Sequence, residues 1–286
     1  MIRTENLNFV YQSDMPFSTA ALHNVNIEIK DGSFTALIGH TGSGKSTLIQ
    51  TFNALIKPTS GRIYVDDYDV CAENADLKEI RKKVGLVFQY PEHQLFEETV
   101  EKDIAFGPKN MGFSEEEIMQ KVKKAAKDVG LADELLKKSP FELSGGQRRR
   151  AAIAGVLATE PKILILDEPM AGLDPHGRDE LIKLLKDIHR KDEEKTIIFV
   201  SHSMEDVAKL AENVIVLNKG EVFASGSVRE VFSKGTELMK IGLNVPEITR
   251  LIIKLREKGI DLPTDIYTVE AAETIIKEKI SGGKNA

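Results

Sequence analysis

The stretch that most limits how this chain folds is Gly39-His40-Thr41-Gly42-Ser43-Gly44-Lys45-Ser46. Its spacing, G-x-x-x-x-G-K-[ST], is that of a phosphate-binding P-loop. The apolar run from Phe34 to Ile38 predicts a buried strand before it, and the residues from Ser46 onward predict a helix after it. A strand, a glycine turn and a helix in this order aim backbone N–H groups at an anion. The stretch therefore predicts an α/β fold that binds a nucleoside triphosphate.

The polar side chains of the P-loop have separate expected tasks. We expect Lys45 to reach the β- and γ-phosphates and the Ser46 hydroxyl to ligate Mg²⁺. A glycine-rich strand-to-helix turn without a ligand is the structural alternative, and the full eight-residue spacing argues against it. The residues expected to contact the nucleotide here are Gly39, His40, Thr41, Gly42, Ser43, Gly44, Lys45, Ser46 and Thr47.

A second apolar run, from Ile163 to Leu166, ends in two acids, Asp167 and Glu168. A buried strand that ends in paired carboxylates is expected to face a cation. Asp167 is therefore predicted to hold Mg²⁺, directly or through water. Glu168 lies one residue later and should point elsewhere, where it can act as general base toward the attacking water. The alternative is a pair of acids that cap a helix at the strand end.

Composition excludes several classes of protein. The net charge of -6 gives no reason to expect a nucleic-acid partner, and the three arginines Arg148 to Arg150 are interpreted as partner or solvent contacts. The single cysteine, Cys71, excludes an intrachain disulfide and suits a reducing compartment. The first residues show no secretory signal, and no apolar run approaches the ~20 residues of a membrane span. If the protein works at a membrane, another component must hold it there.

Hydrophobic periodicity outlines the architecture. Alternating residues from Ile2 to Val10 and from Val25 to Ile29 predict an antiparallel part, and a hairpin is expected around Lys219-Gly220. The buried runs, joined through helices, predict a mostly parallel core sheet. We expect an α/β fold with this core sheet, the antiparallel part, a helical subdomain and a small C-terminal helical extension. The predicted domains are residues 1–232, with the helical subdomain at about 90–160, and residues 233–286.

A second glycine loop opens a helix further along the chain. By itself it fits an anion cradle or an ordinary N-cap serine equally well. Together with the P-loop and the paired acids, it makes the sequence resemble the ATP-binding cassette (ABC) ATPase family over residues 1 to about 230. The residues that resemble the family's signature motif, which completes the ATP site of a partner subunit, are Leu143, Ser144, Gly145, Gly146 and Gln147.

The resemblance to ABC ATPases assigns roles to four more positions. It implies that Gln89 is the Q-loop glutamine, which contacts Mg²⁺ and the membrane partner. His202 resembles the switch histidine near the γ-phosphate, and Tyr11 the aromatic residue under adenine. Ala171 to Asp174 resembles the D-loop, so Asp174 is expected at the partner's ATP site. The catalytic residues implied are Glu168, His202 and Gln89, and the metal ligands Ser46, Gln89 and Asp167.

The segments Gln89 to Phe96 and Asp103 to Asn110 further resemble the ATPases of energy-coupling factor (ECF) vitamin transporters. Ala36 to Ser46 and Asp167 to Arg178 resemble the second A-type subunits of that family. The resemblance implies an ATP- and Mg²⁺-dependent heterodimer with a homologous first A-type ATPase subunit, extended by the C-terminal residues. It implies a transmembrane T component, exchangeable substrate-binding S components, and a peripheral position at the cytoplasmic face of the cell membrane.

A cluster of acids after Gln89 suggests how the chain would meet its membrane partner. Apolar side chains ringed by carboxylates, with Glu101 and Asp103 close by, suit a basic, amphipathic partner helix such as the T component is expected to present. A plain solvated acidic face is the alternative. The residues proposed to couple to the membrane partner are Glu92, Leu95, Phe96, Glu97 and Glu98.

Other functions remain open from the sequence. A cobalt or nickel importer ATPase would carry the same motifs. A soluble ABC ATPase acting on nucleic acid or the ribosome is disfavoured, because no long heptad repeat and only one cassette are present. A non-hydrolysing subunit is disfavoured because Glu168, His202 and Gln147 are all present. One departure from many ABC ATPases is Met170, where threonine or serine is common, and we expect it to be tolerated.

Overall fold

The computed structural model describes residues 1–12 and 18–282, and the strands of this part of the chain form two sheets. The core sheet has the order β10-β9-β3-β8-β7-β6, and only β10 runs antiparallel to its neighbour. Its strands are β3 (Phe34–Gly39), β6 (Val84–Val87), β7 (Ile163–Asp167), β8 (Thr196–Val200), β9 (Asn213–Asn218) and β10 (Glu221–Ser227). The predicted mostly parallel core and the hairpin around Lys219-Gly220 are confirmed.

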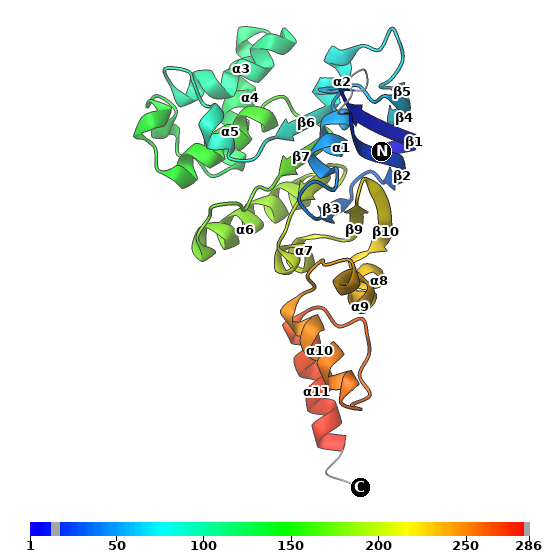
Figure 1. The fold of residues 1–286 in the computed structure, drawn as a ribbon. Helices are drawn as coiled ribbons and strands as arrows, with labels where there is room; N and C mark the ends of the chain where they lie inside the picture. The colour runs from blue at the N-terminus through cyan, green and yellow to red at the C-terminus, as the bar shows by residue number, and fades with distance from the viewer. Residues whose placement is uncertain (13–17, 283–286) are drawn as a thin grey trace.

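The smaller sheet is antiparallel and has the order β2-β1-β4-β5. The predicted antiparallel part is therefore confirmed, and it lies beside the core sheet in Figure 1. Its strands are β1 (Ile2–Tyr11), β2 (Thr19–Ile29), β4 (Ser60–Val65) and β5 (Tyr68–Asp69).

Both faces of the core sheet are covered. Every residue of β3, β6, β7 and β8 is buried, which explains why these strands read as unbroken apolar runs. Leu37 and Ile165 belong to the cluster that includes α1 (Lys45–Phe52) and the small sheet. Their neighbours Ala36 and Leu166 belong to the cluster formed with the helices of the other face. Successive side chains of a strand therefore point to opposite faces of the sheet and pack into two different hydrophobic cores.

The parallel register brings the carboxyl ends of the strands to one edge of the sheet. Val200 of β8 lies opposite Leu37 of β3 on one side and opposite Asp167 of β7 on the other. The P-loop follows β3, the paired acids close β7, and Gln89 follows β6 by two residues. Residues far apart in the sequence therefore converge where ligands bind in α/β sheets.

A layer of helices stands apart from the sheets, at the left of Figure 1. α4 begins with a capping box between Ser114 and Glu117, and its buried face includes Ile118 and Val122. The layer consists of α3 (Val100–Met111), α4 (Glu115–Asp128) and α5 (Gly145–Leu157), with short 3-10 turns η1 (Pro91–Gln94), η2 (Asp133–Leu135) and η3 (Pro140–Glu142).

The remaining helices of the core flank the sheet strands. α6 is capped by Asp174 and begins at Pro175, whose fixed φ suits the first position of a helix. α7, directly after the β8 edge, is capped by Ser203. These helices are α2 (Leu77–Lys83), α6 (Pro175–Lys191) and α7 (Met204–Leu210).

The C-terminal helices extend away from the sheets, as Figure 1 shows at the bottom of the view. The first two of them bury Phe232 and Leu238 in the main core, whereas the last two have a small core of their own around Ile252 and Leu262. The elements are α8 (Val228–Ser233), α9 (Gly235–Lys240), α10 (Glu247–Glu257) and α11 (Val269–Gly282). Within the described part of the chain, none of the helices combines the length and apolarity that a membrane span requires.

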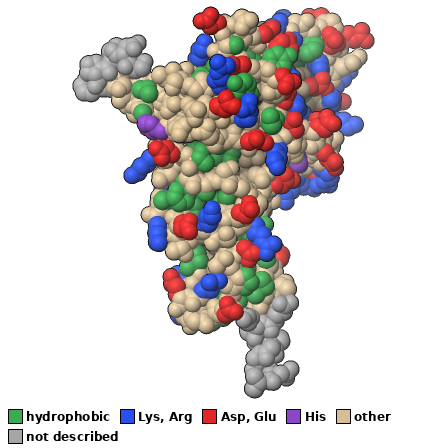
Figure 2. Space-filling model, turned by 90° about the vertical axis from the view of Figure 1, so that its right-hand side faces the viewer, with side chains coloured by type: hydrophobic (Ala, Val, Ile, Leu, Met, Phe, Trp, Pro, Cys, Tyr) green, Lys and Arg blue, Asp and Glu red, His purple; other side chains and the backbone are tan. Residues whose placement is uncertain are grey.

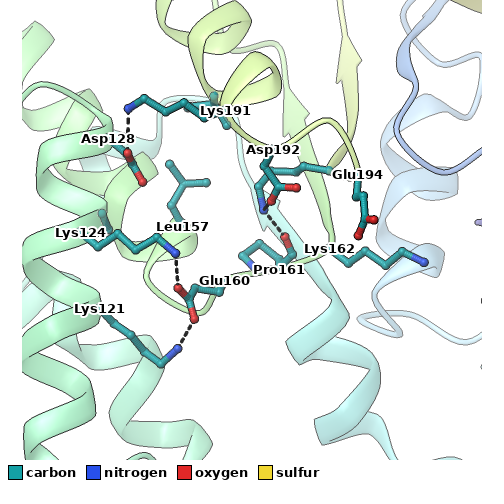
Figure 3. A pocket seen from close by; sticks show the side chains of 13 residues that line it. Lys121, Lys124, Asp128, Leu157, Glu160, Pro161, Lys162, Lys191, Asp192 and Glu194 are labelled. Carbon is teal, nitrogen blue, oxygen red and sulfur yellow. Dashed lines mark hydrogen bonds and ion pairs between the residues drawn. The ribbon is translucent and has the colours of Figure 1, made fainter.

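A cavity of about 520 Å³ separates the helical layer from the core sheet at the edge opposite the P-loop strand end. In Figure 3, Lys121 and Lys124 both reach Glu160, while Lys191 of α6 reaches Asp128 of α4. These three lysines are therefore paired with neighbouring carboxylates, and Lys121 and Lys124 share one. The cavity marks the boundary between the two layers.

Candidate functional site

The P-loop turn is built from glycines for steric reasons. Gly39 and Gly44 have φ of 153° and 100°, in the region that L side chains rarely adopt. A Cβ on Gly39 would lie 2.3 Å from the carbonyl oxygen of Leu217, and one on Gly44 would lie 2.4 Å from that of Ala21. The loop is therefore packed against β2 and β9 so closely that only glycine fits.

Lys45 is held inside the P-loop by its hydrogen bonds. Its side chain is buried, and its Nζ donates to the carbonyl oxygens of Gly39 (2.8 Å) and His40 (2.9 Å). Burial lowers the pKa of Lys45, while the carboxylates of Glu168 and Asp167 act in the opposite direction. Since neutral carbonyls hold the ammonium, its charge is available to a phosphate group.

The start of α1 has unused hydrogen-bond donors. Its N-cap is Gly44, and no side chain caps the helix there. The first N–H groups of a helix have no partner within the helix and need one from outside. By contrast, Ser144 caps α5 and Asp174 caps α6. The start of the P-loop helix therefore fits an anion.

Oxygen atoms suited to Mg²⁺ meet beside this helix. The Ser46 hydroxyl, at the second residue of α1, lies near the Asp167 carboxylate at the end of β7. Burial raises the pKa of Asp167, and the nearby Ser46 hydroxyl acts against that rise. A partly desolvated carboxylate next to a hydroxyl is the oxygen donor set that Mg²⁺ prefers. The predicted ligands Ser46 and Asp167 therefore fit the ion.

Glu168 lies between the two other residues predicted to be catalytic. Gln89 Nε2 donates to its Oε2 at 3.0 Å, and His202 Nε2 lies 2.6 Å from its Oε1. These residues follow β6, β7 and β8, which are neighbouring strands of the core sheet. Glu168 itself has φ of 47°, an uncommon backbone conformation for a residue other than glycine. The sheet edge thus brings together the residues that the sequence proposed.

Tyr11 lies at the rim of the P-loop helix. Its hydroxyl is 3.0 Å from the Thr47 hydroxyl, and its ring makes an edge contact with Phe9 at 4.7 Å between centroids. The ring remains 44% exposed. A flat, partly exposed ring anchored next to the phosphate loop is placed where a base could stack, and the adenine contact stays a prediction.

The signature residues form their own structure away from the P-loop. Ser144 Oγ accepts from the N–H of Gln147 at 3.3 Å, and Gln147 Oε1 accepts from the N–H of Ser144 at 3.0 Å. Leu143 is buried, whereas Gly145 and Gly146 are exposed. In the part of the chain that the structure describes, no hydrogen bond or ion pair joins these residues or Asp174 to the P-loop.

The acidic face expected after Gln89 is smaller than predicted. Glu92 is not free for a partner, because it accepts two hydrogen bonds from Arg149, at 2.9 and 2.6 Å. Burial works to raise the pKa of Glu92, but the bonds from Arg149 outweigh it and the pKa is lowered. Asp103 is also buried, and its Oδ1 accepts from the N–H groups of Phe96 and Glu97 at 3.1 and 3.2 Å. These two acids are structural.

The exposed part of that face is narrower and more aromatic. Phe96 is 61% exposed and makes an edge contact with Phe106 at 5.0 Å between centroids. Leu95 is half-buried against the main core, and Glu97 is half-buried as well. Glu98 is exposed and pairs with Lys102 one turn along the chain. Phe96, Glu97 and Glu98 are thus the residues left to meet a partner.

For Arg149 and Arg150, the interpretation as partner or solvent contacts is wrong. Arg149 is 4% exposed and bonded within the chain, and Arg150 binds the Val129 carbonyl at 2.7 Å and Glu180 at 3.0 Å. The sequence carries a signal for this, because Arg149, Ile153 and Leu157 repeat at four-residue spacing on the buried face of α5. Met170, by comparison, lies buried in the main core.

Comparisons with known proteins agree on one family. Residues 22–171 match the ABC transporter family. The energy-coupling factor transporter ATP-binding protein EcfA2 of Clostridium acetobutylicum is 58% identical over 284 residues, which cover 99% of each chain.

Two solved structures are also similar to the chain. The structure of cbiO1 from Clostridium perfringens, described as part of the ABC transporter complex cbiONQ, has 41% identity and a TM-score of 0.73, and covers 88% of this chain and 98% of its own. A dimeric, post-hydrolysis ATP-binding cassette bound to ADP and Pi has 31% identity and a TM-score of 0.70, and covers 80% of this chain and 99% of its own.

Proposed function

The chain belongs to the ABC transporter family and, within it, to the ATP-binding proteins of energy-coupling factor transporters, and from this premise we propose how its residues do their work. The chain is an ATP-hydrolysing transport enzyme, and its turnover powers uptake of vitamins or other micronutrients through a membrane complex. The observation that carries the mechanism is the position of Glu168, held between Gln89 and His202 at the sheet edge that bears the P-loop.

Nucleotide binding rests on the P-loop and the uncapped start of α1. The backbone N–H groups of the loop surround the phosphates, and Lys45 moves from its two carbonyl partners to the β- and γ-phosphates. Tyr11 stacks under the adenine. Ser46, Asp167 and Gln89 would hold Mg²⁺, which would offset the negative charge that develops on the phosphates during transfer.

Hydrolysis rests on Glu168. Its carboxylate accepts a proton from the water that attacks the γ-phosphate. Gln89 and His202 bind one carboxylate oxygen each, which fixes the orientation of the group before the reaction. When nucleotide is bound, His202 also contacts the γ-phosphate. The same histidine therefore binds the nucleotide and orients the general base Glu168.

The second half of the ATP site comes from another subunit. The hydrogen bonds of Ser144, Gln147 and Asp174 are local, and within the described residues none joins them to the P-loop of their own chain. We place them against the nucleotide of a homologous first A-type subunit, whose signature motif in turn covers Lys45 and its ATP. The resulting heterodimer holds each ATP between two chains, and the C-terminal helices extend the contact.

The dimer is proposed to act from the cytoplasmic face of the cell membrane, as a peripheral partner of a T component that works with exchangeable S components. Phe96, Glu97 and Glu98, supported by Leu95, form the surface that meets the T component. Their position supports this, because they follow Gln89 in the chain and are fixed by the buried Asp103. Movement at the ATP site can therefore reach the membrane partner through a short, well-held segment.

The surface charge agrees with a protein partner in place of a nucleic acid. On the face shown in Figure 2, basic and acidic side chains alternate and do not gather into a continuous basic stripe. A nucleic-acid interface would need clustered lysines and arginines to neutralise phosphates.

Replacement of Glu168 by glutamine tests this mechanism. Glu168→Gln removes the proton acceptor but keeps the shape of the side chain, so ATP should still bind while hydrolysis falls by roughly 10² or more. The measurement is ATP turnover and nucleotide affinity of the complete transporter complex that carries the variant chain.

Glu160→Gln is the matched control for that variant. Glu160 also has a positive φ, of 53°, but it pairs with Lys121 and Lys124 in the helical layer. Its replacement should leave turnover unchanged. Equal turnover in the parent and in Glu168→Gln would assign the general base to another residue.

A further inference from the structure

One buried arginine joins three segments of the catalytic face. The guanidinium of Arg149, on α5, donates from Nε and Nη2 to the Glu92 carboxylate at 2.9 and 2.6 Å. Its Nη1 donates to the carbonyl oxygens of Pro169 and Ala171 at 3.1 and 2.9 Å. A single side chain therefore links the helix that follows the signature motif, the turn η1 after Gln89, and the chain immediately after Glu168.

The two carbonyls that Arg149 holds belong to a turn that begins at the proposed general base. The N–H of Ala171 donates back to the carbonyl oxygen of Glu168 at 3.0 Å, which closes the turn. Glu168 has a positive φ, and such a conformation persists only where the surrounding structure holds it. The bonds from Arg149 to the carbonyl oxygens of Pro169 and Ala171 supply such a restraint.

The segment after Gln89 touches this turn a second time. Tyr90 has φ of 54°, and a Cβ on Gly172 would lie 3.3 Å from its ring atom Cε1. Gly172 also has a positive φ, of 74°. Tyr90 therefore lies close to the turn, and the Glu92–Arg149 pair connects the segment after Gln89 to residues 169 and 171.

The chemistry of the contact requires an arginine. The planar guanidinium directs one edge at a carboxylate and the rest at carbonyl oxygens, whereas a lysine ammonium is a compact charge without this fork. The side chains of Arg149 and Glu92 are 5% and 14% exposed. A buried ion pair is weak evidence of added stability, since two well-packed apolar residues often serve as well. Its geometry, which reaches the Glu168 turn, is what points to a functional role.

We propose that Arg149 is a positioning residue for ATP hydrolysis, which sets the place of the Glu168 turn and ties it through Glu92 to the segment after Gln89. The segment that is proposed to meet the membrane partner and the turn that carries the base then move together. This inference rests on the proposed role of Glu168 as general base.

The test compares two arginines of the same helix. Arg149→Lys and Glu92→Gln weaken the link, while Arg150→Lys and Glu180→Gln make the same changes in the neighbouring pair, which does not touch the turn. ATP turnover of the complete complex is measured for each variant. Glu168→Gln shows how much turnover is lost when the ATP site of this chain no longer hydrolyses ATP. Arg149→Lys and Glu92→Gln should each lower kcat by at least half as much as Glu168→Gln lowers it, with KM for ATP unchanged. The control variants Arg150→Lys and Glu180→Gln should match the parent.

Thermal unfolding of each purified chain separates positioning from simple stability. A merely structural role would lower the unfolding temperature and leave kcat per folded complex at the parent value, which would overturn the inference. A rise in KM equal to the fall in kcat would overturn it too, because that pattern places Arg149 in nucleotide binding. If Glu168→Gln hydrolysed ATP at the parent rate, Glu168 would not be the general base. If Glu168→Gln were inactive but Arg149→Lys were fully active, only the inference about Arg149 would be overturned.

Discussion

Lys45 illustrates how a single residue is prepared for its ligand. The chain buries the ammonium and gives it only carbonyl partners, so burial lowers its pKa and the folded protein bears the cost of an incompletely compensated charge. A phosphate group that enters the loop supplies the missing negative charge. The residue is therefore placed for binding at some expense in stability, a common arrangement at functional sites.

Lys45→Ala should weaken ATP binding by roughly tenfold to a hundredfold, because a charge-assisted bond to phosphate is worth about 1.5–3 kcal/mol. Nucleotide affinity of the purified chain, measured by calorimetry, checks this. Lys57→Ala is the control, since Lys57 is exposed beyond the end of α1. Parent affinity in Lys45→Ala would contradict the assignment of the loop.

Motif residues could be predicted because their spacing is set by chemistry along the chain. Gly39 to Ser46, Asp167 and Glu168 each sit within a short run whose order already fixes the turn or the strand end. The Arg149–Glu92 pair could not be predicted in this way, because its partners are 57 residues apart and meet only when α5 packs against η1. The acids near Phe96 were misjudged for the same reason, since burial of Glu92 and Asp103 depends on tertiary packing.

At the scale of elements, helices differ in whether a side chain caps their N-terminus. α1 begins without a side-chain cap at the phosphate loop, whereas α5 begins with a closed capping box between Ser144 and Gln147. The parallel strands were predictable from their apolar runs. α3 was not, because Gly107 and Pro108 interrupt the sequence pattern, although the helix continues through both. Packing on α4 and α5, which bury Val122 and Ile153 in the same cluster as Ile104 of α3, outweighs the local preference.

Gly145→Asp should separate the two ATP sites of the dimer. A Cβ at Gly145 meets nothing within 4 Å, so the variant should fold normally. The new carboxylate would face the phosphates of the partner's ATP, so turnover of the complex should fall while this chain binds ATP at its own P-loop with parent affinity. Both quantities are measured on the same preparation.

Ser227→Asp adds the same charge at the capped start of α8 and serves as the control. It should leave both quantities unchanged. An equal loss of ATP affinity in the isolated Gly145→Asp chain would mean that the loop serves its own nucleotide.

Over the whole molecule, the structure joins three regions to one sheet edge. The helical layer contacts this edge through Arg149, which binds the Pro169 carbonyl oxygen, and Gln89 contacts it by its hydrogen bond to Glu168. The C-terminal helices contact it through His40, whose Nε2 lies 2.9 Å from the Ile241 carbonyl oxygen. Such contacts let one bound nucleotide bias several distant surfaces, as coupling between sites requires.

Phe96→Ala should weaken the link to the membrane partner without affecting the ATP site. Phe96 is 61% exposed and contributes only an edge contact to Phe106, so its loss should cost little stability. Uptake per ATP hydrolysed should fall, or the T component should be lost on purification. Phe223→Ala, at a 38% exposed ring on β10, is the control. Parent coupling and an intact complex in Phe96→Ala would leave this surface without the proposed role.

The central claim is that hydrolysis at Glu168 drives uptake across a membrane. The most direct test is substrate uptake into vesicles that contain the complete complex, with ATP supplied on the side that bears this chain. We expect ATP-dependent uptake with the parent chain, and its loss in a Glu168→Gln complex that still assembles and still binds ATP. Uptake at the parent rate in that variant, or uptake that needs no ATP, would contradict it.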